Sequence, residues 1–192
     1  MNPILWIDLE TTGTLPERSA IIQIACALEI GGEIVETFSQ KMRPHEGTLI
    51  DPKALEVQGV TEKEIWEWDD PAEVYDRYYS WLNENGQKGN KSARFIPAGY
   101  NAGFDLDFVR AFIDFYSGGP YAFWDFLQFK PIDPYPWIVT LWRYGRLPII
   151  DCKLGTVCAC LGIEIKAHDP MSDIMATREV TNRLLGKMQE VL

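Results

Sequence analysis

Two acidic side chains with a spacing suited to metal binding lie near the start of the chain. Asp8 and Glu10 follow the apolar residues 4–7, and Leu9 separates them. Residues two apart in a strand point to the same face, so a strand here would project both carboxylates together. Like charges repel each other unless a cation lies between them, and hard divalent cations prefer carboxylate oxygens. The pair therefore predicts half of a metal site.

Chance alone can place two acids at this spacing. The chain has 28 acidic residues in 192, so about four such pairs are expected at random, most of them on solvated faces. This pair differs because Leu5, Trp6 and Ile7 precede it, a pattern typical of a buried strand. Further acids from other parts of the chain are needed to complete a site.

A second acidic segment follows a predicted strand and begins a predicted helix. It contains Asp105 and Asp107, but side chains two apart on a helix point about 200° apart, so only one can face the site. Asp105 lies in the first turn, next to the strand end, where the helix dipole favours an anion. We expect Asp105 to belong to the site and Asp107 to be solvated or to cap the helix.

The third segment combines a histidine with an acid. Asp169 and Pro170 suit the N-cap and first position of a helix, which places Asp173 about one turn in and His168 in the loop before it. A lone histidine is more often structural, but the near-neutral pKa of imidazole suits proton transfer beside an acid. The other histidine, His45, has no such context and is expected to be a loop residue.

The secondary structure that must position these residues is predicted to change from strands to alternating strands and helices along the chain. Apolar periodicity, turn residues and caps predict a meander of strands followed by strands interleaved with helices, which indicates an α/β sheet of mixed direction. The predicted strands run from residue 4 to the turn at Gly13 and over 20–30, 33–42, 94–98 and about 129–132. The predicted helices are 52–57, one opened by a capping box at 61–64, 71–83, 104–116, 134–144, 153–161 and 172–192. Residues 85–92 are expected to form a flexible loop, and the aromatic segment 121–137 is either a wall that faces substrate or part of the core.

Composition restricts the classes of protein to which this chain can belong. Its 192 residues are enough for one domain with a full core. It has no apolar stretch of about 18 residues and no basic signal-peptide region, so a cytoplasmic location without a membrane partner is expected. The four cysteines lack metal-finger spacing and are expected to be reduced core residues. A net charge of −10 argues against a nucleic-acid-coating protein but allows short-footprint binding at one metal-filled cleft.

The three acidic segments resemble the exonuclease motifs of the DEDDh exonuclease family, which includes the epsilon proofreading subunit of DNA polymerase III and ribonuclease T. The resemblance lies in residues 8–13, in residues 101–105, and in His168 with Asp173. Residues 50–61 also resemble the epsilon-type connection between the first two motifs, whereas residues 6–10 resemble the opening of oligoribonucleases. The resemblance implies an α/β ribonuclease H-like fold with a central mixed five-stranded sheet flanked by helices, formed as a single exonuclease domain by residues 1–192.

The resemblance also implies a reaction and the residues that perform it. The expected activity is 3′–5′ removal of nucleoside 5′-monophosphates, with two Mg²⁺ or Mn²⁺ ions held by carboxylates and a histidine as general base. The expected metal ligands are Asp8, Glu10, Asp105 and Asp173, and the expected base is His168. The expected contacts to the terminal nucleotide are Leu9, Thr11, Thr12, Gly13, Asn101 and Phe104. Ordinary packing against the sheet is at least as good an interpretation of Phe104 as stacking on a base.

The sequence leaves the substrate and the partners open. The expected partner is the 3′ end of a nucleic acid, with single-stranded DNA favoured over RNA. One alternative is a 3′–5′ exoribonuclease similar to oligoribonuclease or ribonuclease T, which contacts with a 2′-hydroxyl would distinguish. Another is a non-catalytic subunit associated with a polymerase, although the presence of all the expected catalytic side chains argues against it. A homodimer and a polymerase partner are both compatible with the sequence.

Overall fold

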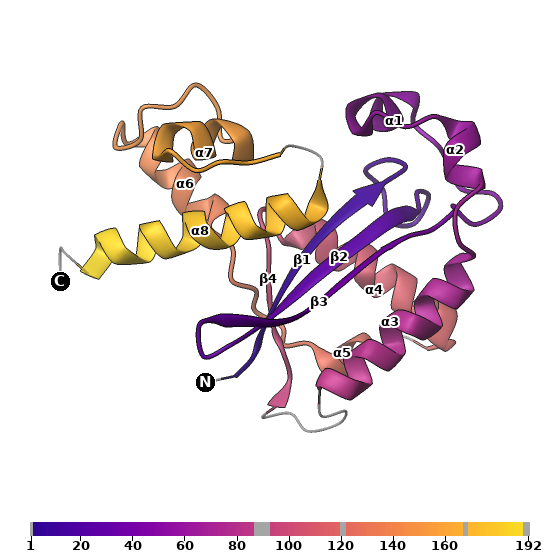
Figure 1. Ribbon diagram of the computed structural model, residues 1–192. Helices are drawn as coiled ribbons and strands as arrows, with labels where there is room; N and C mark the ends of the chain where they lie inside the picture. Colours follow the sequence, from indigo (N-terminus) through magenta and orange to yellow (C-terminus); the bar gives the residue numbers. More distant parts are fainter. Residues whose placement is uncertain (1, 87–92, 120–121, 167–168, 190–192) are drawn as a thin grey trace.

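A four-stranded sheet of mixed direction forms the centre of the computed structural model, which describes residues 2–86, 93–119, 122–166 and 169–189 (Figure 1). The strands are ordered β3-β2-β1-β4. β1 (Ile4–Thr11) pairs antiparallel with β2 (Ile21–Ile30) and parallel with β4 (Ile96–Ala98). β3 (Glu33–Lys41) pairs antiparallel with β2 and completes the predicted meander. The expected loop at 85–92 falls largely outside the described residues.

Four strands, rather than the expected five, form the sheet among the described residues. The fifth position holds two isolated bridges, which join Phe95 to Leu127 and Ala98 to Ile132. The bridge residues are three positions apart on one side and five on the other, so the second segment must bulge between them. Pro131 lies in the bulge and has no N–H to donate to a ladder. The predicted strand at 129–132 is therefore reduced to one bridge, and a short helix, α5 (Phe123–Phe126), precedes it.

Most of the helices begin at the positions that their capping residues predict. The side chain of Asp51 accepts the N–H of Lys53, and Thr61 and Glu64 form the expected capping box. The last helix begins at Pro170, as the pair Asp169-Pro170 predicts, and thus two residues before the range 172–192. The helices are α1 (Pro52–Gln58), α2 (Glu62–Trp66), α3 (Pro71–Asn85), α4 (Gly103–Ser117), α5, α6 (Tyr135–Arg143), α7 (Leu154–Leu161) and α8 (Pro170–Gln189).

Different helices cover the two faces of the sheet (Figure 1). One face of β1 carries Leu5, Ile7 and Leu9, which pack in the main core with apolar residues of α3 and α4. The other face carries Trp6, which packs with Ile174 of α8. Because strand residues alternate between faces, the two acids of β1 lie on the same face as Trp6, the face that α8 crosses. The fold thus positions the start of α8 over the acidic end of β1.

A partly buried ion pair attaches α8 to the sheet. Arg178 donates Nε to Glu29 Oε2 at 2.7 Å, and Trp6 Nε1 donates to the same oxygen at 2.9 Å. The side chains of Arg178 and Glu29 are only 24% and 12% exposed, so the pair is well shielded from water. Arg178 also donates to the carbonyl of Gly32 in the β2–β3 turn. These contacts hold α8 at one angle across β1 and β2.

Replacing Arg178 by glutamine is expected to destabilise the protein by about 1–3 kcal/mol, because it leaves the carboxylate of Glu29 shielded and short of a charged partner. Urea unfolding of both proteins measures the difference. Arg110→Gln is the control, because Arg110 makes an exposed ion pair with Asp107 that should contribute less than about 1 kcal/mol. Equal losses for the two variants would contradict the structural role given to Arg178.

The structure bears on two expectations drawn from composition, which concern the cysteines and membrane-spanning helices. All four cysteines are free thiols, but only Cys26 and Cys158 are buried, so the expectation that all are core residues holds for half of them. Cys160 is exposed and Cys152 is half-buried. Across the described ranges, no helix combines the length and apolar character needed to cross a bilayer.

Candidate active site

The end of β1 presents Asp8 and Glu10 beside a free strand edge. β4 pairs with β1 only as far as Trp6, so the edge of β1 beyond Trp6 is not covered by β4. Asp105, in the first turn of α4, takes up this edge: its Oδ1 accepts the N–H of Leu9 at 3.1 Å. Asp105 is 5% exposed, whereas Asp8 and Glu10 keep part of their surface accessible. A cation can therefore reach the group from the α8 side.

The structure separates the two acids of the second segment as the helical geometry predicts. Asp105 is buried against β1, whereas Asp107 is exposed and pairs with Arg110 at 3.0 Å. The expected placement of both residues agrees with the structure. The metal-binding role of Asp105 stays a prediction.

The third segment brings an acid from the far end of the chain to the same place. Asp169 caps α8 by accepting the N–H of Ser172 at 3.1 Å, and Asp173 follows in the first turn. His168 lies outside the described residues, so its role as a base stays a prediction. His45 lies in a loop, as expected, and its ring stacks on Phe115 with centroids 5.6 Å apart.

Burial and mutual repulsion raise the pKa values of the clustered acids. The pKa of Asp8 lies well above its usual range, first because burial desolvates the carboxylate and then because of the charges of Asp105, Asp173 and Glu10. Burial followed by the charge of Asp173 raises the pKa of Glu10 to about 7. Burial also raises the pKa of Asp105, although the N–H of Leu9 partly opposes the shift. The three segments therefore place four carboxylates within electrostatic reach of one another.

This donor set fits a hard divalent cation. All four side chains offer carboxylate oxygens, which Mg²⁺ and Mn²⁺ prefer, and a cation would relieve the repulsion among them. Within the described part of the chain, no three His, Cys, Asp or Glu side chains already converge as a metal-binding cluster.

The chain passes very close to β1 at Gly99, shortly before the second acidic segment. A Cβ at Gly99 would lie 2.9 Å from the carbonyl oxygen of Ile7, which is closer than real side chains come. The next turn is also specialised, because Asn101 adopts a left-handed φ of 57°. Glycine thus allows the chain to pass against β1 before α4 begins, and this passage sets where Asp105 meets Leu9.

Replacing Gly99 by alanine is expected to move this turn away from β1, lower the nuclease activity expected from the sequence by about tenfold or more, and destabilise the fold by about 1–3 kcal/mol. Gly186→Ala is the matched control. A Cβ at Gly186 would meet no described atom within 4 Å, and alanine favours its helix by about 0.5–1 kcal/mol. Thermal unfolding and initial rates measure both effects. An active, undamaged Gly99→Ala protein would show that the close approach is dispensable.

Two residues expected to contact the terminal nucleotide have their hydroxyls engaged within the fold. Thr11 Oγ1 donates to the carbonyl of Gly13 at 2.7 Å. Thr12 Oγ1 donates to the carbonyl of Leu49 at 2.8 Å and accepts the N–H of Ala20 at 3.0 Å. Both threonines are buried, so these bonds shape the loop after β1. Their contact with substrate stays a prediction, as do those of Leu9, Gly13 and Asn101.

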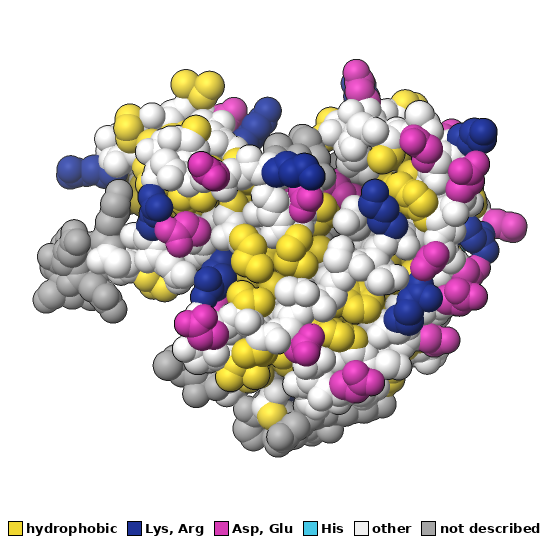
Figure 2. Space-filling model, in the orientation of Figure 1, with side chains coloured by type: hydrophobic (Ala, Val, Ile, Leu, Met, Phe, Trp, Pro, Cys, Tyr) yellow, Lys and Arg dark blue, Asp and Glu magenta, His cyan; other side chains and the backbone are white. Residues whose placement is uncertain are grey.

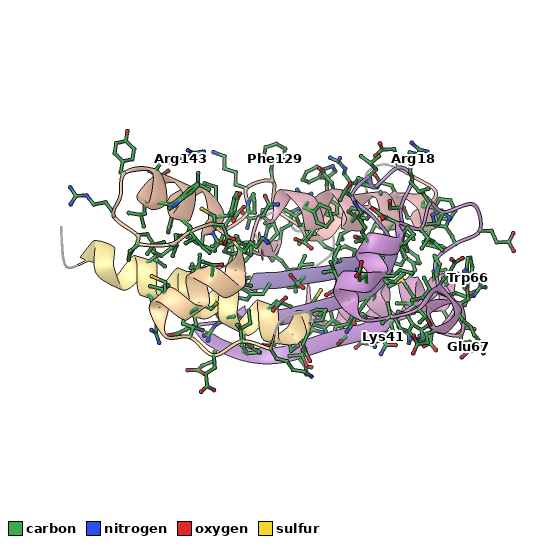
Figure 3. All side chains as sticks on the ribbon, turned by 90° about the horizontal axis from the view of Figure 1, so that it is seen from above. Arg18, Lys41, Trp66, Glu67, Phe129 and Arg143 are labelled. Carbon is green, nitrogen blue, oxygen red and sulfur yellow. The ribbon has the colours of Figure 1, made fainter. Side chains whose placement is uncertain are left out.

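The aromatic residues divide between the core and the surface. Phe104 is half-buried and its ring lies 5.0 Å from that of Phe108, so it packs in the fold while keeping an accessible side. In the aromatic segment, Phe123 and Phe126 are buried core residues. Phe129 is 78% exposed, points outward in Figure 3, and stacks on Trp124. Phe123 and Phe126 therefore belong to the core, whereas a substrate-facing role for the exposed members stays a prediction.

A groove of about 860 Å³ adjoins the acids. Its lining includes Asp173, Asn101 of the turn before α4, Tyr135 at the start of α6, and Lys153 and Gly155 at the start of α7. Figure 2 shows the molecule hollowed at the top of the view, between the parts that α6–α7 and α1–α2 occupy in Figure 1. Asp173 thus lines an open groove on the surface rather than a closed cavity.

Two residues that shape this site were not among those predicted from the sequence. Asp133 accepts backbone N–H groups at the start of both α4 and α6. The dipeptide Asp133-Pro134 was an available signal, because Asp-Pro had already predicted the starts of two other helices. Gln58 of α1 donates Nε2 to the carbonyl of Thr11 at 2.9 Å, a contact between distant segments that has no local signal.

Comparison with known proteins gives consistent matches over most of the chain. The family model described as Exonuclease matches residues 5–181, a span that contains all three acidic segments. Ribonuclease T of Buchnera aphidicola subsp. Baizongia pistaciae is 33% identical over 190 residues, covering 92% of this chain and 79% of that protein. DNA polymerase III PolC-type of Bacillus cereus is 25% identical over 181 residues, covering 94% of this chain but 11% of that protein. The chain thus spans about a tenth of the length of the PolC-type relatives.

Solved structures share the fold. E. coli exonuclease I in complex with a dT13 oligonucleotide has a TM-score of 0.77 at 22% identity, covering 100% of this chain and 42% of that chain. Exonuclease I from Methylocaldum szegediense has a TM-score of 0.74 at 24% identity, covering 94% of this chain and 39% of that chain. This likeness agrees with the α/β ribonuclease H-like fold that the sequence predicts.

Proposed function

The chain belongs to the DEDDh 3′–5′ exonuclease family, and we propose that it removes nucleoside 5′-monophosphates one at a time from the 3′ end of single-stranded DNA. The observation that carries the proposal is a group of four carboxylates from three distant segments, in which burial and neighbouring charges, that of Asp173 among them, raise the pKa values of Asp8, Glu10 and Asp105. Repulsion among these carboxylates does not stabilise the fold, whereas their combined negative charge would bind a divalent cation.

Each site residue has a role in the proposed reaction. Asp8, Glu10, Asp105 and Asp173 would hold two Mg²⁺ or Mn²⁺ ions. Divalent ions in such sites supply an activated water and stabilise charge on the leaving oxygen. His168 is proposed to accept the proton of the attacking water, a role that suits imidazole because it gains and releases protons near neutral pH. The hydrolysis adds water across the phosphodiester, leaving a 5′-monophosphate and a new 3′-hydroxyl.

The terminal nucleotide is proposed to bind at the end of β1. Backbone groups at Leu9, Thr11, Thr12 and Gly13 lie on one side of it and Asn101 on the other. The accessible side of Phe104 is placed to stack on a base, a contact that is tolerant of base identity. The groove beside Asp173 supports this proposal, because it offers the rest of the strand a path away from the acids.

RNA is the second candidate substrate. The relative ribonuclease T matches this chain over 79% of its own length, whereas the PolC-type relatives match over about a tenth of theirs. A ribonuclease of this kind would use the same four carboxylates and differ in contacts with the 2′-hydroxyl.

A direct comparison of 3′ ends tests the proposal. We expect 5′-labelled single-stranded DNA to shorten stepwise in Mg²⁺ or Mn²⁺, faster than RNA of the same sequence and faster than fully paired DNA. A duplex with a mispaired 3′ end should be degraded at an intermediate rate, because its terminal nucleotides separate more easily. Faster degradation of RNA would select the second candidate. No mononucleotide release from any substrate would refute the enzymatic proposal.

A further inference from the structure

One carboxylate outside the group of four acids joins two walls of the site. Asp133 lies between the bridge residue Ile132 and the start of α6. Its Oδ1 accepts the N–H of Asn101 at 3.0 Å and that of Tyr135 at 2.9 Å, and its Oδ2 accepts the N–H of Ala102 at 3.0 Å. One side chain therefore satisfies three backbone donors from segments about 30 residues apart in the chain.

We propose that Asp133 is a positioning residue, which holds the turn before α4 so that Asp105 meets the edge of β1 in the geometry needed for metal binding. The proposal deepens the proposed function, because it concerns the placement of one of the four carboxylates. Asp133 itself is not proposed to touch the metal or the substrate.

The start of α4 depends on help from elsewhere in the chain. The N-cap position is Ala102, whose methyl side chain cannot accept a hydrogen bond, and the preceding Asn101 is held in a left-handed conformation. The free N–H groups of this turn are therefore satisfied by the carboxylate of Asp133, which acts as a cap supplied from a distance. Asp105 follows Ala102 by three residues, less than one helical turn, so a shift of the cap moves its carboxylate directly.

A second contact strengthens the same junction. Tyr100 donates its hydroxyl to the carbonyl of Cys152, in the loop before α7, and its ring meets that of Tyr135 edge-on at 5.5 Å. The turn before α4 is thus attached to the starts of α6 and α7, the same elements that line the groove. Asp133 is the charged member of this junction, and its three charge-assisted hydrogen bonds are the strongest link in it.

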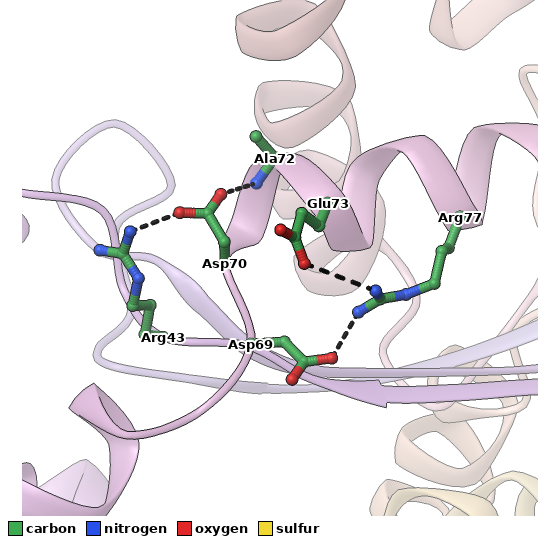
Figure 4. Close-up of polar contacts among 6 residues, drawn as sticks. All are labelled: Arg43, Asp69, Asp70, Ala72, Glu73 and Arg77. Carbon is green, nitrogen blue, oxygen red and sulfur yellow. Dashed lines mark hydrogen bonds and ion pairs between the residues drawn. The ribbon is translucent and has the colours of Figure 1, made fainter.

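The chain contains a matched control for this residue. Asp70 also precedes a proline, and its Oδ1 accepts the N–H of Ala72 at 2.8 Å, as Asp133 does with Tyr135 two residues on (Figure 4). Asp70 caps α3, which carries none of the four acids, and pairs with Arg43. Asparagine keeps one acceptor oxygen and replaces the other with an NH2 group. Asp70→Asn can therefore keep its bond to Ala72 and loses the charged pair with Arg43, whereas Asp133→Asn leaves a backbone N–H of the junction without its acceptor.

The test compares the two variants in the full chain by Mn²⁺ titration, oligonucleotide hydrolysis and thermal unfolding. We expect Asp133→Asn to weaken Mn²⁺ binding by about tenfold or more and to lower kcat by a similar factor, with KM changed less than about twofold. Asp70→Asn should keep Mn²⁺ affinity and kcat near those of the unchanged protein, because the charged pair that it loses lies away from the four acids. The loss for Asp133→Asn should persist at high salt, because a loss due only to the missing charge would be screened.

Each outcome decides the proposal. Mn²⁺ affinity equal in Asp133→Asn and Asp70→Asn overturns it, as does a loss that disappears at high salt. If Asp133→Asn does not fold, Asp133→Ser retains one acceptor oxygen and is judged by the same comparison. If the unchanged protein binds Mn²⁺ but hydrolyses nothing, the proposed function fails while the Mn²⁺ comparison still decides the role of Asp133.

Discussion

Replacing Asp105 by asparagine is expected to lower the nuclease rate by at least about 10³-fold while leaving the fold intact. The amide oxygen of asparagine can still accept the N–H of Leu9, so the contact at 3.1 Å between α4 and β1 is preserved. The variant loses the negative charge that a divalent cation requires from this position. Initial rates on single-stranded DNA at saturating Mg²⁺ measure the effect.

The same substitution should stabilise the protein in the absence of divalent metal. Burial raises the pKa of Asp105, so its charged form is disfavoured in the folded state, and a neutral amide removes that penalty. A higher Tm for Asp105→Asn than for the unchanged protein at pH 8 in chelator is the expected result. Activity and stability then move in opposite directions, which is typical of a residue kept for its function rather than for folding.

Asp107→Asn is the matched control for this variant. Asp107 lies two residues further along α4, is exposed, and pairs with Arg110. We expect its loss to change the rate less than about twofold, since exposed ion pairs contribute little. An inactive Asp107→Asn protein beside an active Asp105→Asn protein would reverse the assignment of the second acidic segment.

Removing divalent metal is expected to stop hydrolysis completely and to make stability fall as pH rises. The pKa of Glu10 is 4.5 in an ordinary environment and about 7 in this fold, so the folded state binds more protons than the unfolded chain between these values. The stability contributed by its protonated form is complete below pH 4.5 and is lost as pH rises through about 7. Asp8 and Asp105, whose pKa values are also raised, act in the same direction.

Added Mg²⁺ or Mn²⁺ should reverse this instability at high pH. As pH rises the carboxylates lose their protons more readily to a competing cation, and the bound cation stabilises the folded state by mass action. At pH 5 protons compete for the same oxygens, so the gain in Tm should be much smaller. Differential scanning calorimetry in chelator and in Mg²⁺ from pH 5 to pH 8 measures both effects.

The control for this experiment is Asp105→Asn, which lacks one carboxylate of the group. Its metal-free stability should depend less steeply on pH, and its Tm should rise less with Mg²⁺. A Tm for the unchanged protein that does not depend on metal at pH 8 would contradict a metal site at these residues.

Much of the fold could be predicted from the sequence because it depends on short-range physics. Alternating apolar residues determined β1, β2 and β3, since the strand period of two places alternate side chains in the core. Asp51-Pro52 and Asp169-Pro170 determined the starts of α1 and α8, because a cap bonds only to its own first turn. Helical geometry likewise separated Asp105 from Asp107 within one turn of α4.

The strand at the edge of the sheet could not be predicted from local sequence. A fifth strand near 129–132 was expected from an apolar, aromatic stretch, but whether a segment pairs depends on its register against β4. Two extra residues and Pro131 break that register, and no local pattern in 121–134 reports the spacing of bridge partners on another strand. Tertiary contacts therefore decided the number of strands in the described sheet.

The site likewise combines features that local sequence determines with features that tertiary contacts determine. The sequence by itself determined which acids are available and that Asp8 and Glu10 share a face, because residue type and strand period are local properties. Only the tertiary structure decided that the free edge of β1 meets Asp105, that Arg178 holds Asp173 over the same face, and that Asp133 caps the turn between them. These contacts join residues 30 to 150 positions apart, and their energies depend on burial and charge that exist only once the chain has folded.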